Sequence, residues 1–87
     1  MQYQVVYTKS VQKQLNKLSD KIFLQISTKI RQLSANPYSP FLDVKKLKDL
    51  EDEYRLRAGD YRIVYKIENG QFVILIISVA HRKDVYK

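Results

Sequence analysis

The segment 68–71 has the sequence Glu-Asn-Gly-Gln and separates two runs that are rich in β-branched and aromatic residues. An Asn-Gly pair between such runs is typical of a two-residue type I′ hairpin, because both central residues of that turn need a positive φ. The turn therefore predicts two antiparallel strands and fixes their register. On one face the expected pairs are Glu68 with Gln71, Ile67 with Phe72, Tyr65 with Ile74, Ile63 with Ile76 and Tyr61 with Ser78. On the other face they are Arg62 with Ile77, Val64 with Leu75 and Lys66 with Val73.

A second turn, at 57–60, precedes the first of these strands and pairs it with a strand that begins near Glu53. If Ala58-Gly59 is its loop, the expected pairs are Leu56 with Tyr61, Arg55 with Arg62 and Arg57 with Asp60. Both turns then place Arg55, Arg57 and Arg62 on one face of the sheet. A slip of one residue would move all three into the core, because side chains alternate between the faces.

The opposite face supplies the core of the predicted sheet. Its expected members are Leu56, Tyr61, Ile63, Tyr65, Ile67, Phe72, Ile74 and Ile76. The last strand, 72–79, is apolar on both alternations, which is typical of a strand covered on both sides. Its remaining side chains, Val73, Leu75, Ile77 and Val79, are expected to need cover from the 41–50 segment or from a partner protein.

The N-terminal half predicts one strand and two helices. Residues 3–7 are β-branched and aromatic, which favours a strand. A stripe with helical spacing follows, formed by Val11, Leu15, Leu18, Ile22, Ile26, Ile30 and Leu33. We expect helices near 9–18 and 20–35, paired as a hairpin or a bent helix, and two prolines end the second. The fold class is α+β with the order β-α-α-β-β-β, in which a helical hairpin packs on one face of a small, mainly antiparallel four-stranded sheet. Residues 1–87 form a single domain.

Composition limits the chemistry that the chain can support. Sixteen Lys and Arg against nine Asp and Glu give a formal charge of +7, which favours nucleic acid or another anionic partner. The chain has no cysteine and one histidine, which excludes disulfides and thiol nucleophiles and argues against a zinc site. No cofactor and no metal are expected. The N-terminus does not resemble a signal peptide and the longest apolar run is too short for a bilayer, so a cytoplasmic location without membrane contact is expected.

The candidate site combines the arginine face with the C-terminal tail. The tail contributes His81, Arg82, Lys83 and Tyr86. Arginine binds phosphate through forked, permanently charged donors, and an aromatic ring can stack on a base. A simpler interpretation is that the arginines are paired locally, Arg57 with Asp60 and Arg55 with Glu53. A chain without metal, cofactor or nucleophile suits RNA cleavage by the substrate's own 2′-hydroxyl, with Tyr86, His81 or a neighbouring Lys or Arg as the base.

The segments YRLRAGDYRIVYKI and HRKDVY resemble the C-terminal half of the RelE/ParE superfamily of toxins from toxin–antitoxin modules, and are most similar to its RelE branch. The N-terminal strand, the helical hairpin and the KKLK segment fit the same order of elements. The resemblance implies a ribosome-dependent endonuclease that cuts mRNA in the ribosomal A site and leaves a 2′,3′-cyclic phosphate and a 5′-hydroxyl. It also implies a cognate antitoxin as a separate chain, and hence a toxin–antitoxin hetero-oligomer.

The resemblance also assigns roles to residues. Arg62 matches the central phosphate-binding arginine, Arg82 the arginine that stabilises the transition state or acts as acid, and Tyr86 the tyrosine that stacks on the substrate base. Arg55 and Arg57 stand where some members carry lysines, and His81 is a second candidate base. Candidate RNA-binding residues are Lys45, Lys46, Lys48 and Lys83. Two alternatives stay open, a ParE-like DNA gyrase inhibitor without nuclease activity and an inactive interaction module.

Overall fold

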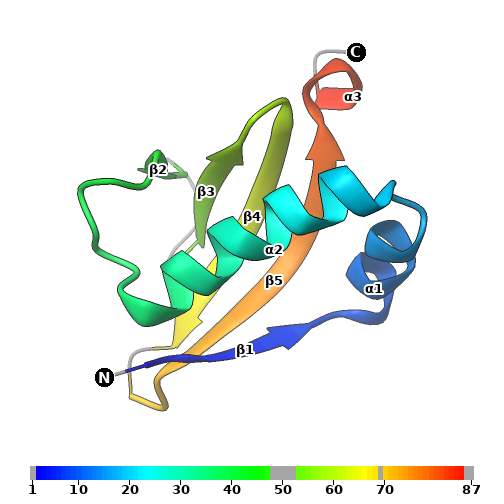
Figure 1. Cartoon of the computed structure of the whole chain (residues 1–87). Coiled ribbons are helices and arrows are strands. Elements are labelled where there is room, and N and C mark those ends of the chain that lie inside the picture. Colours follow the sequence, from blue (N-terminus) through cyan, green and yellow to red (C-terminus); the bar gives the residue numbers. More distant parts are fainter. Residues whose placement is uncertain (1, 48–52, 69, 86–87) are drawn as a thin grey trace.

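The computed structural model describes residues 2–47, 53–68 and 70–85, and it is an α+β fold in which helices cover one face of a five-stranded sheet (Figure 1). The elements are β1 (Gln4–Tyr7), α1 (Lys9–Asn16), α2 (Asp20–Ala35), β2 (Val44–Lys46), β3 (Glu53–Ala58), β4 (Tyr61–Glu68), β5 (Val73–His81) and α3 (Arg82–Val85). The strand order is β1-β5-β4-β3-β2; β1 is parallel to β5 and the other pairs are antiparallel. The predicted fold class is confirmed, with two additions: β2 makes a fifth strand, and the tail contains α3.

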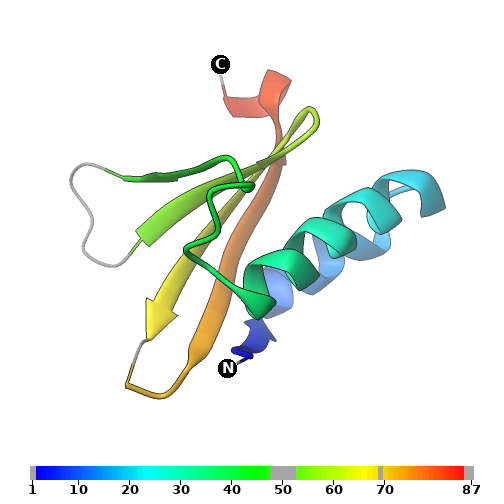
Figure 2. The ribbon, with the colours of Figure 1, turned by 60° about the vertical axis from the view of Figure 1, so that its left-hand side comes forward.

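Both long helices begin where capping residues predict. The Thr8 hydroxyl accepts a hydrogen bond from the Val11 N–H at 3.2 Å, and the Ser19 hydroxyl accepts one from the Ile22 N–H at 3.3 Å. Each cap satisfies an N–H that the first helical turn leaves without a partner. The two helices lie on the same side of the sheet (Figure 2). No helix among the described residues has the length and the apolar character needed to cross a membrane.

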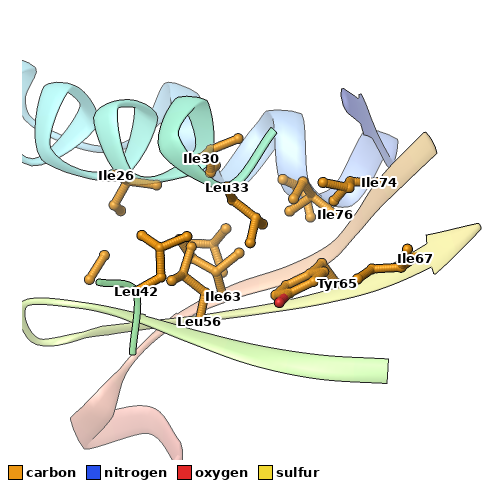
Figure 3. Close-up of a cluster of buried hydrophobic side chains, with 13 residues drawn as sticks. Ile26, Ile30, Leu33, Leu42, Leu56, Ile63, Tyr65, Ile67, Ile74 and Ile76 are labelled. Carbon is orange, nitrogen blue, oxygen red and sulfur yellow. The ribbon is translucent and has the colours of Figure 1, made fainter. Parts of the chain in front are cut away.

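The core lies between α2 and the sheet (Figure 3). From α2 it takes Ile26, Ile30 and Leu33, which belong to the apolar stripe expected from the sequence. From the sheet it takes Leu56, Ala58, Ile63, Tyr65, Ile67, Ile74, Ile76 and Val79. Full burial of one large apolar side chain stabilises the fold by about 1.5–3 kcal/mol, so these contacts hold the sheet against the helices. Leu42, just before β2, is also buried and attaches that segment to the body.

The β3–β4 hairpin has the predicted faces but not the predicted register. Its two loop residues are Gly59 and Asp60, so Arg57 lies opposite Arg62, and Arg55 lies opposite Val64. The predicted loop, Ala58-Gly59, was therefore wrong by one position, and the predicted strand register was wrong by two residues. Gly59 has φ 61°, and glycine at the first loop position is what a type II′ turn prefers. A shift of two leaves every side chain on its predicted face.

The β4–β5 connection is longer than the sequence predicts. Glu68 pairs with Val73, and the Gln71 N–H donates to the Glu68 carbonyl at 3.1 Å. The positive φ near this turn belongs to Phe72, at 54°, and not to Gly70; Asn69 lies outside the described residues. The ring of Phe72 contacts Tyr3 with centroids 5.5 Å apart, and its carbonyl accepts from the Gln4 N–H at 2.8 Å. These contacts with β1 override the local preference of Asn-Gly for a type I′ turn.

A β-bulge in β5 changes the faces of its last residues. The register shifts between Val64 and Tyr65, so that Tyr65 pairs with Ile76 but Val64 pairs with Ser78. Beyond the bulge Ile63 pairs with Val79, Arg62 with Ala80 and Tyr61 with His81. The predicted pairs in this region were wrong, because a bulge inserts one unpaired residue and reverses the alternation.

The bulge also corrects the predicted outer face of β5. Val79 is 4% exposed and belongs to the core, whereas Val73, Leu75 and Ile77 are half-buried on the face away from the helices. The Val79 N–H donates to the side-chain oxygen of Gln14 at 3.2 Å. The 41–47 part of the segment expected to cover this face instead leads into β2, at the far edge of the sheet from β1. Among the described residues, both long helices lie on the opposite side of the sheet from this outer face (Figure 2).

Candidate phosphate-binding site

A cavity of about 350 Å³ lies at the end of the β3–β4 hairpin, next to the start of α3. Its lining residues are Arg55, Arg57, Gly59, Asp60, Tyr61, Arg62 and Arg82. The four arginines named from the sequence for this site thus meet in one place. Four arginines that line one concave surface form an environment suited to an anion.

The sheet positions three of these arginines. Arg57 and Arg62 lie directly across the β3–β4 ladder, and Arg55 lies two residues before Arg57 on the same face. Like charges in directly opposed positions repel each other across a strand pair. Such an arrangement is stabilised when an anion lies between the charges.

Arg82 joins the site through the main chain. Its N–H donates to the carbonyl of Asp60 at 2.7 Å, which attaches the start of α3 to the β3–β4 turn. Figure 1 shows α3 beside the tip of this hairpin. The contact brings Arg82 to the cavity although twenty positions separate it from Arg62. The side chain of Arg82 is exposed, so it is accessible to a ligand.

Arg55 is the buried member of the group. Its side chain is 10% exposed, and its Nη1 has no hydrogen-bond partner among the described residues. A buried donor without a partner costs about 1–3 kcal/mol, and more when it carries a charge. Because Arg55 lines the cavity, its positive charge can stabilise an anion bound there.

The ion pairs of the site differ from those suggested by the sequence. Arg55 Nη2 lies 3.6 Å from Asp43 Oδ1, and Arg57 Nε lies 3.9 Å from Asp43 Oδ2. Within the described chain, neither Asp60 nor Glu53 forms an ion pair with these arginines. Sequence reasoning missed Asp43, because it precedes a strand that the sequence did not predict and lies twelve positions before Arg55. The Asp43 carbonyl also accepts from the Arg57 N–H at 3.0 Å.

His81 lies on the other side of the turn. The bulge turns it toward the helix face, where its ring meets Tyr61 edge-on, with centroids 5.1 Å apart and an interplanar angle of 88°. It lines a second cavity of about 220 Å³ together with Ile22, Gln25, Gly59, Asp60 and Tyr61. It does not line the arginine cavity. His81 Nδ1 accepts from the Lys83 N–H at 3.1 Å, so the neutral ring carries its proton on Nε2.

The remaining candidate residues are distributed around the site. Lys45 and Lys46 are exposed on β2, and Lys45 shares the face of Arg55, which lies directly opposite. Lys83 is exposed on α3. Lys48 and Tyr86 lie outside the described residues. In the described ranges, no three His, Asp or Glu side chains gather closely enough to hold a metal ion.

Comparison with known proteins identifies close relatives over the whole length. A sequence model of the ParE toxin of the type II toxin–antitoxin system parDE matches residues 5–86. Toxin RelE of Mycobacterium tuberculosis is 33% identical over 86 residues, covering 98% of this chain and 87% of that protein. The mRNA interferase toxin RelE of Escherichia coli K12 is 29% identical, with coverages of 99% and 92%. A chain in the crystal structure of the archaeal RelE–RelB complex from Pyrococcus horikoshii superposes with a TM-score of 0.81 at 32% identity, covering 94% of this chain and 97% of that one.

Proposed function

Because this chain belongs to the RelE/ParE superfamily of type II toxin–antitoxin toxins, we propose that it is a metal-independent endoribonuclease that cleaves mRNA in the ribosomal A site and so inhibits translation. It is a toxin of a RelBE-type toxin–antitoxin system. The observation that carries the proposed activity is the convergence of four arginines on one cavity, one of them buried with a free donor.

The proposed reaction uses the substrate's own nucleophile. The 2′-oxygen attacks the adjacent phosphorus, the bond to the 5′-oxygen breaks, and the products are a 2′,3′-cyclic phosphate and a 5′-hydroxyl. A proton leaves the 2′-hydroxyl and a proton reaches the departing 5′-oxygen. The protein then has to orient the phosphate and stabilise the negative charge that develops on its oxygens, which fixed guanidinium donors do without a metal ion.

The positions of the arginines suggest separate roles. Arg62 lines the cavity and is the proposed main ligand of the scissile phosphate, assisted by Arg57 directly across the ladder. Arg55 contributes a largely buried positive charge to the cavity lining. Arg82, exposed at the start of α3, is the proposed group that stabilises the leaving oxygen or protonates it. Tyr86 is proposed to stack on a substrate base, as the family resemblance implies.

His81 is a weaker candidate for the base than the sequence suggested. It lines the smaller cavity on the helix side of the turn and is absent from the lining of the arginine cavity. A general base must come within hydrogen-bonding reach of the proton that it removes. We therefore propose that Tyr86, a neighbouring Lys or Arg, or the ribosomal surroundings of the mRNA accept the first proton.

The proposed partners are mRNA, the ribosome and an antitoxin, and the proposed location is the cytoplasm. The charge of +7 and the exposed Lys45, Lys46 and Lys83 favour approach to RNA. Solved relatives include toxin–antitoxin complexes from archaea and Mycobacterium tuberculosis. The open apolar face of β5 is suited to a bound antitoxin segment, which would make the complex a hetero-oligomer.

A ParE-like activity is the second candidate, because the matching family model describes the ParE toxin. In that case the chain binds DNA gyrase and cleaves no RNA. Arg82 at the cavity is the feature that a gyrase ligand does not require. The first candidate cuts mRNA and the second reduces DNA supercoiling, so these two readouts separate them.

The test is to map mRNA 5′ ends in a translation extract with wild-type protein and with Arg62→Ala, Arg82→Ala and Tyr86→Phe. We expect new ends at A-site codons that weaken by about 10²-fold or more in the two arginine variants, as for loss of a transition-state donor. Arg31→Ala, an exposed arginine on α2, is the matched control and should cut like wild type. Intact mRNA together with loss of DNA supercoiling would favour the ParE-like alternative instead.

A further inference from the structure

We propose that Asp43 is a positioning residue of the arginine cavity: its carboxylate orients the guanidinium groups of Arg55 and Arg57 for a bound phosphate. This inference rests on the proposed nuclease function and adds to it a residue outside the cavity lining. Asp43 acts through the two arginines, because it is absent from the residues that line the cavity.

Asp43 lies just before β2 and contacts two arginines of β3. Its two carboxylate oxygens face different arginines, Oδ1 toward Arg55 Nη2 at 3.6 Å and Oδ2 toward Arg57 Nε at 3.9 Å. The Asp43 carbonyl accepts a hydrogen bond from the Arg57 N–H at 3.0 Å, so the backbone of Asp43 is held next to β3. One residue thus contacts two of the four cavity arginines through its side chain.

The geometry leaves the arginines available for substrate. Both distances exceed the 2.7–3.2 Å of a normal N–H···O bond, so Asp43 attracts the guanidinium groups without saturating their donors. Only Nη2 of Arg55 faces Asp43, and Nη1 stays free of hydrogen-bond partners within the described chain. A carboxylate that held both arginines in tight bidentate pairs would compete with a phosphate; this one leaves donors free.

The charge pattern explains why such a residue is needed. Arg57 lies directly opposite Arg62, and like charges so placed push each other apart. A carboxylate on the side of Arg57 that faces β2 offsets this repulsion before any substrate binds. Asp43 is 58% exposed, so its field is screened and its effect on folding is expected to be small. Its expected effect is on the orientation of the arginines, where a displacement of about 1 Å can cost up to 10²-fold in rate.

The test compares Asp43→Asn and Asp43→Glu in single-turnover cleavage of mRNA on programmed ribosomes. We expect Asp43→Asn to lower the maximal rate about tenfold, while the concentration for half-maximal rate is unchanged or lower, because a negative charge near the RNA is lost. Asp43→Glu should recover most of the rate. Glu68→Gln is the control for charge, since Glu68 is exposed at the opposite end of β4 from Arg62, six residues or about 20 Å away. An unchanged maximal rate in Asp43→Asn, or a loss matched by the control, would overturn the proposal.

A second readout separates this proposal from the proposed function. The side-chain Nε–H signals of Arg55 and Arg57 can be followed by NMR in the free protein and with a 2′-deoxy dinucleotide, which cannot be cleaved. With Asp43→Asn we expect both signals to broaden or move and to respond differently to the dinucleotide. If the wild-type protein cuts no RNA, the proposed nuclease function is contradicted. The positioning role of Asp43 is then tested by the Nε–H signals alone. Signals that are the same in Asp43→Asn and wild type would contradict the positioning role.

Discussion

Arg55 is a charged residue placed where a protein usually puts an apolar one. Its side chain is nine-tenths buried, it has one long ion pair with an exposed partner, and its Nη1 has no hydrogen-bond partner among the described residues. An apolar residue in place of Arg55 would leave no buried charge without a partner, because Asp43 is 58% exposed. The arginine is therefore better explained by ligand binding than by folding, as is common where activity needs strained or unsatisfied groups.

This interpretation predicts opposite effects of Arg55→Met on stability and on activity. We expect the free energy of unfolding in denaturant to stay within about 1 kcal/mol of wild type or to rise. Cleavage should fall by about 10²-fold, because a phosphate ligand is lost. A loss of more than about 2 kcal/mol in stability would instead mean that Arg55 holds the sheet together.

Tyr65 gives a prediction about pH. Burial raises the pKa of its phenol, and the nearby Tyr54 and Tyr38 raise it further. In the unfolded chain the pKa is near 10, so above about pH 10 the unfolded state loses this proton while the folded state keeps it. Stability contributed by the neutral phenol is fully present below pH 10 and is lost as the pH rises from there.

The variant that checks this is Tyr65→Phe. The Tyr65 hydroxyl is buried and has no hydrogen-bond partner among the described residues. We therefore expect the unfolding free energy at about pH 8 to change by less than about 1 kcal/mol. Between about pH 10 and 11 the variant should lose less stability than wild type; part of the loss remains, because burial also raises the pKa of Tyr7. If the unfolding free energy falls equally steeply with pH in the two proteins above pH 10, the raised pKa of Tyr65 is contradicted.

At the scale of elements, the β3–β4 turn at Gly59 lies against Gln25 of α2 and is hydrogen-bonded to the start of α3. Gly59 has φ 61°, and a Cβ there would overlap the side-chain nitrogen of Gln25. The carbonyl of the next residue, Asp60, accepts a hydrogen bond from the N–H of Arg82. A change in this turn is thus expected to affect both folding and the position of Arg82.

Gly59→Ala should lower the free energy of unfolding by about 1–2 kcal/mol, because an alanine is strained at positive φ. The Gln25 amide ends a flexible side chain and can move away, so most of the cost is in the backbone. The matched control is Gly70→Ala, which has no atom within 4 Å of the new Cβ and no positive φ. It should stay within about 0.5–1 kcal/mol of wild type or be slightly more stable. Equal losses in the two variants would refute the role given to the turn.

The strands also show what a sequence can and cannot predict. The faces of Arg55, Arg57 and Arg62 were predicted correctly, because alternation has a period of two and the β3–β4 register was wrong by two. The length of the β4–β5 loop was wrong, because Phe72 is held by contacts with β1 that local propensity does not contain. The bulge in β5 was not predictable, since that strand is apolar on both alternations. It placed Val79 in the core and His81 on the helix side of the turn.

At the scale of the whole molecule, the two faces of the sheet carry different kinds of side chain. The helix face is filled by the core (Figure 3). The outer face has arginines at the hairpin end and half-buried Val73, Leu75 and Ile77 on β5. The order of elements and the arginine face could be predicted from the sequence; Asp43 could not, because its pairing depends on how the 41–47 segment joins the sheet.

The central claim is that the arginine cavity stabilises a phosphate which the RNA's own 2′-hydroxyl attacks. It is tested most directly with two mRNAs on programmed ribosomes, one natural and one with a single 2′-deoxy nucleotide at the cleaved A-site position. We predict that wild-type protein cuts the natural mRNA, leaves a 2′,3′-cyclic phosphate, and does not cut the 2′-deoxy mRNA. Cleavage of both at similar rates, or a 3′-hydroxyl on the upstream product, would contradict the account.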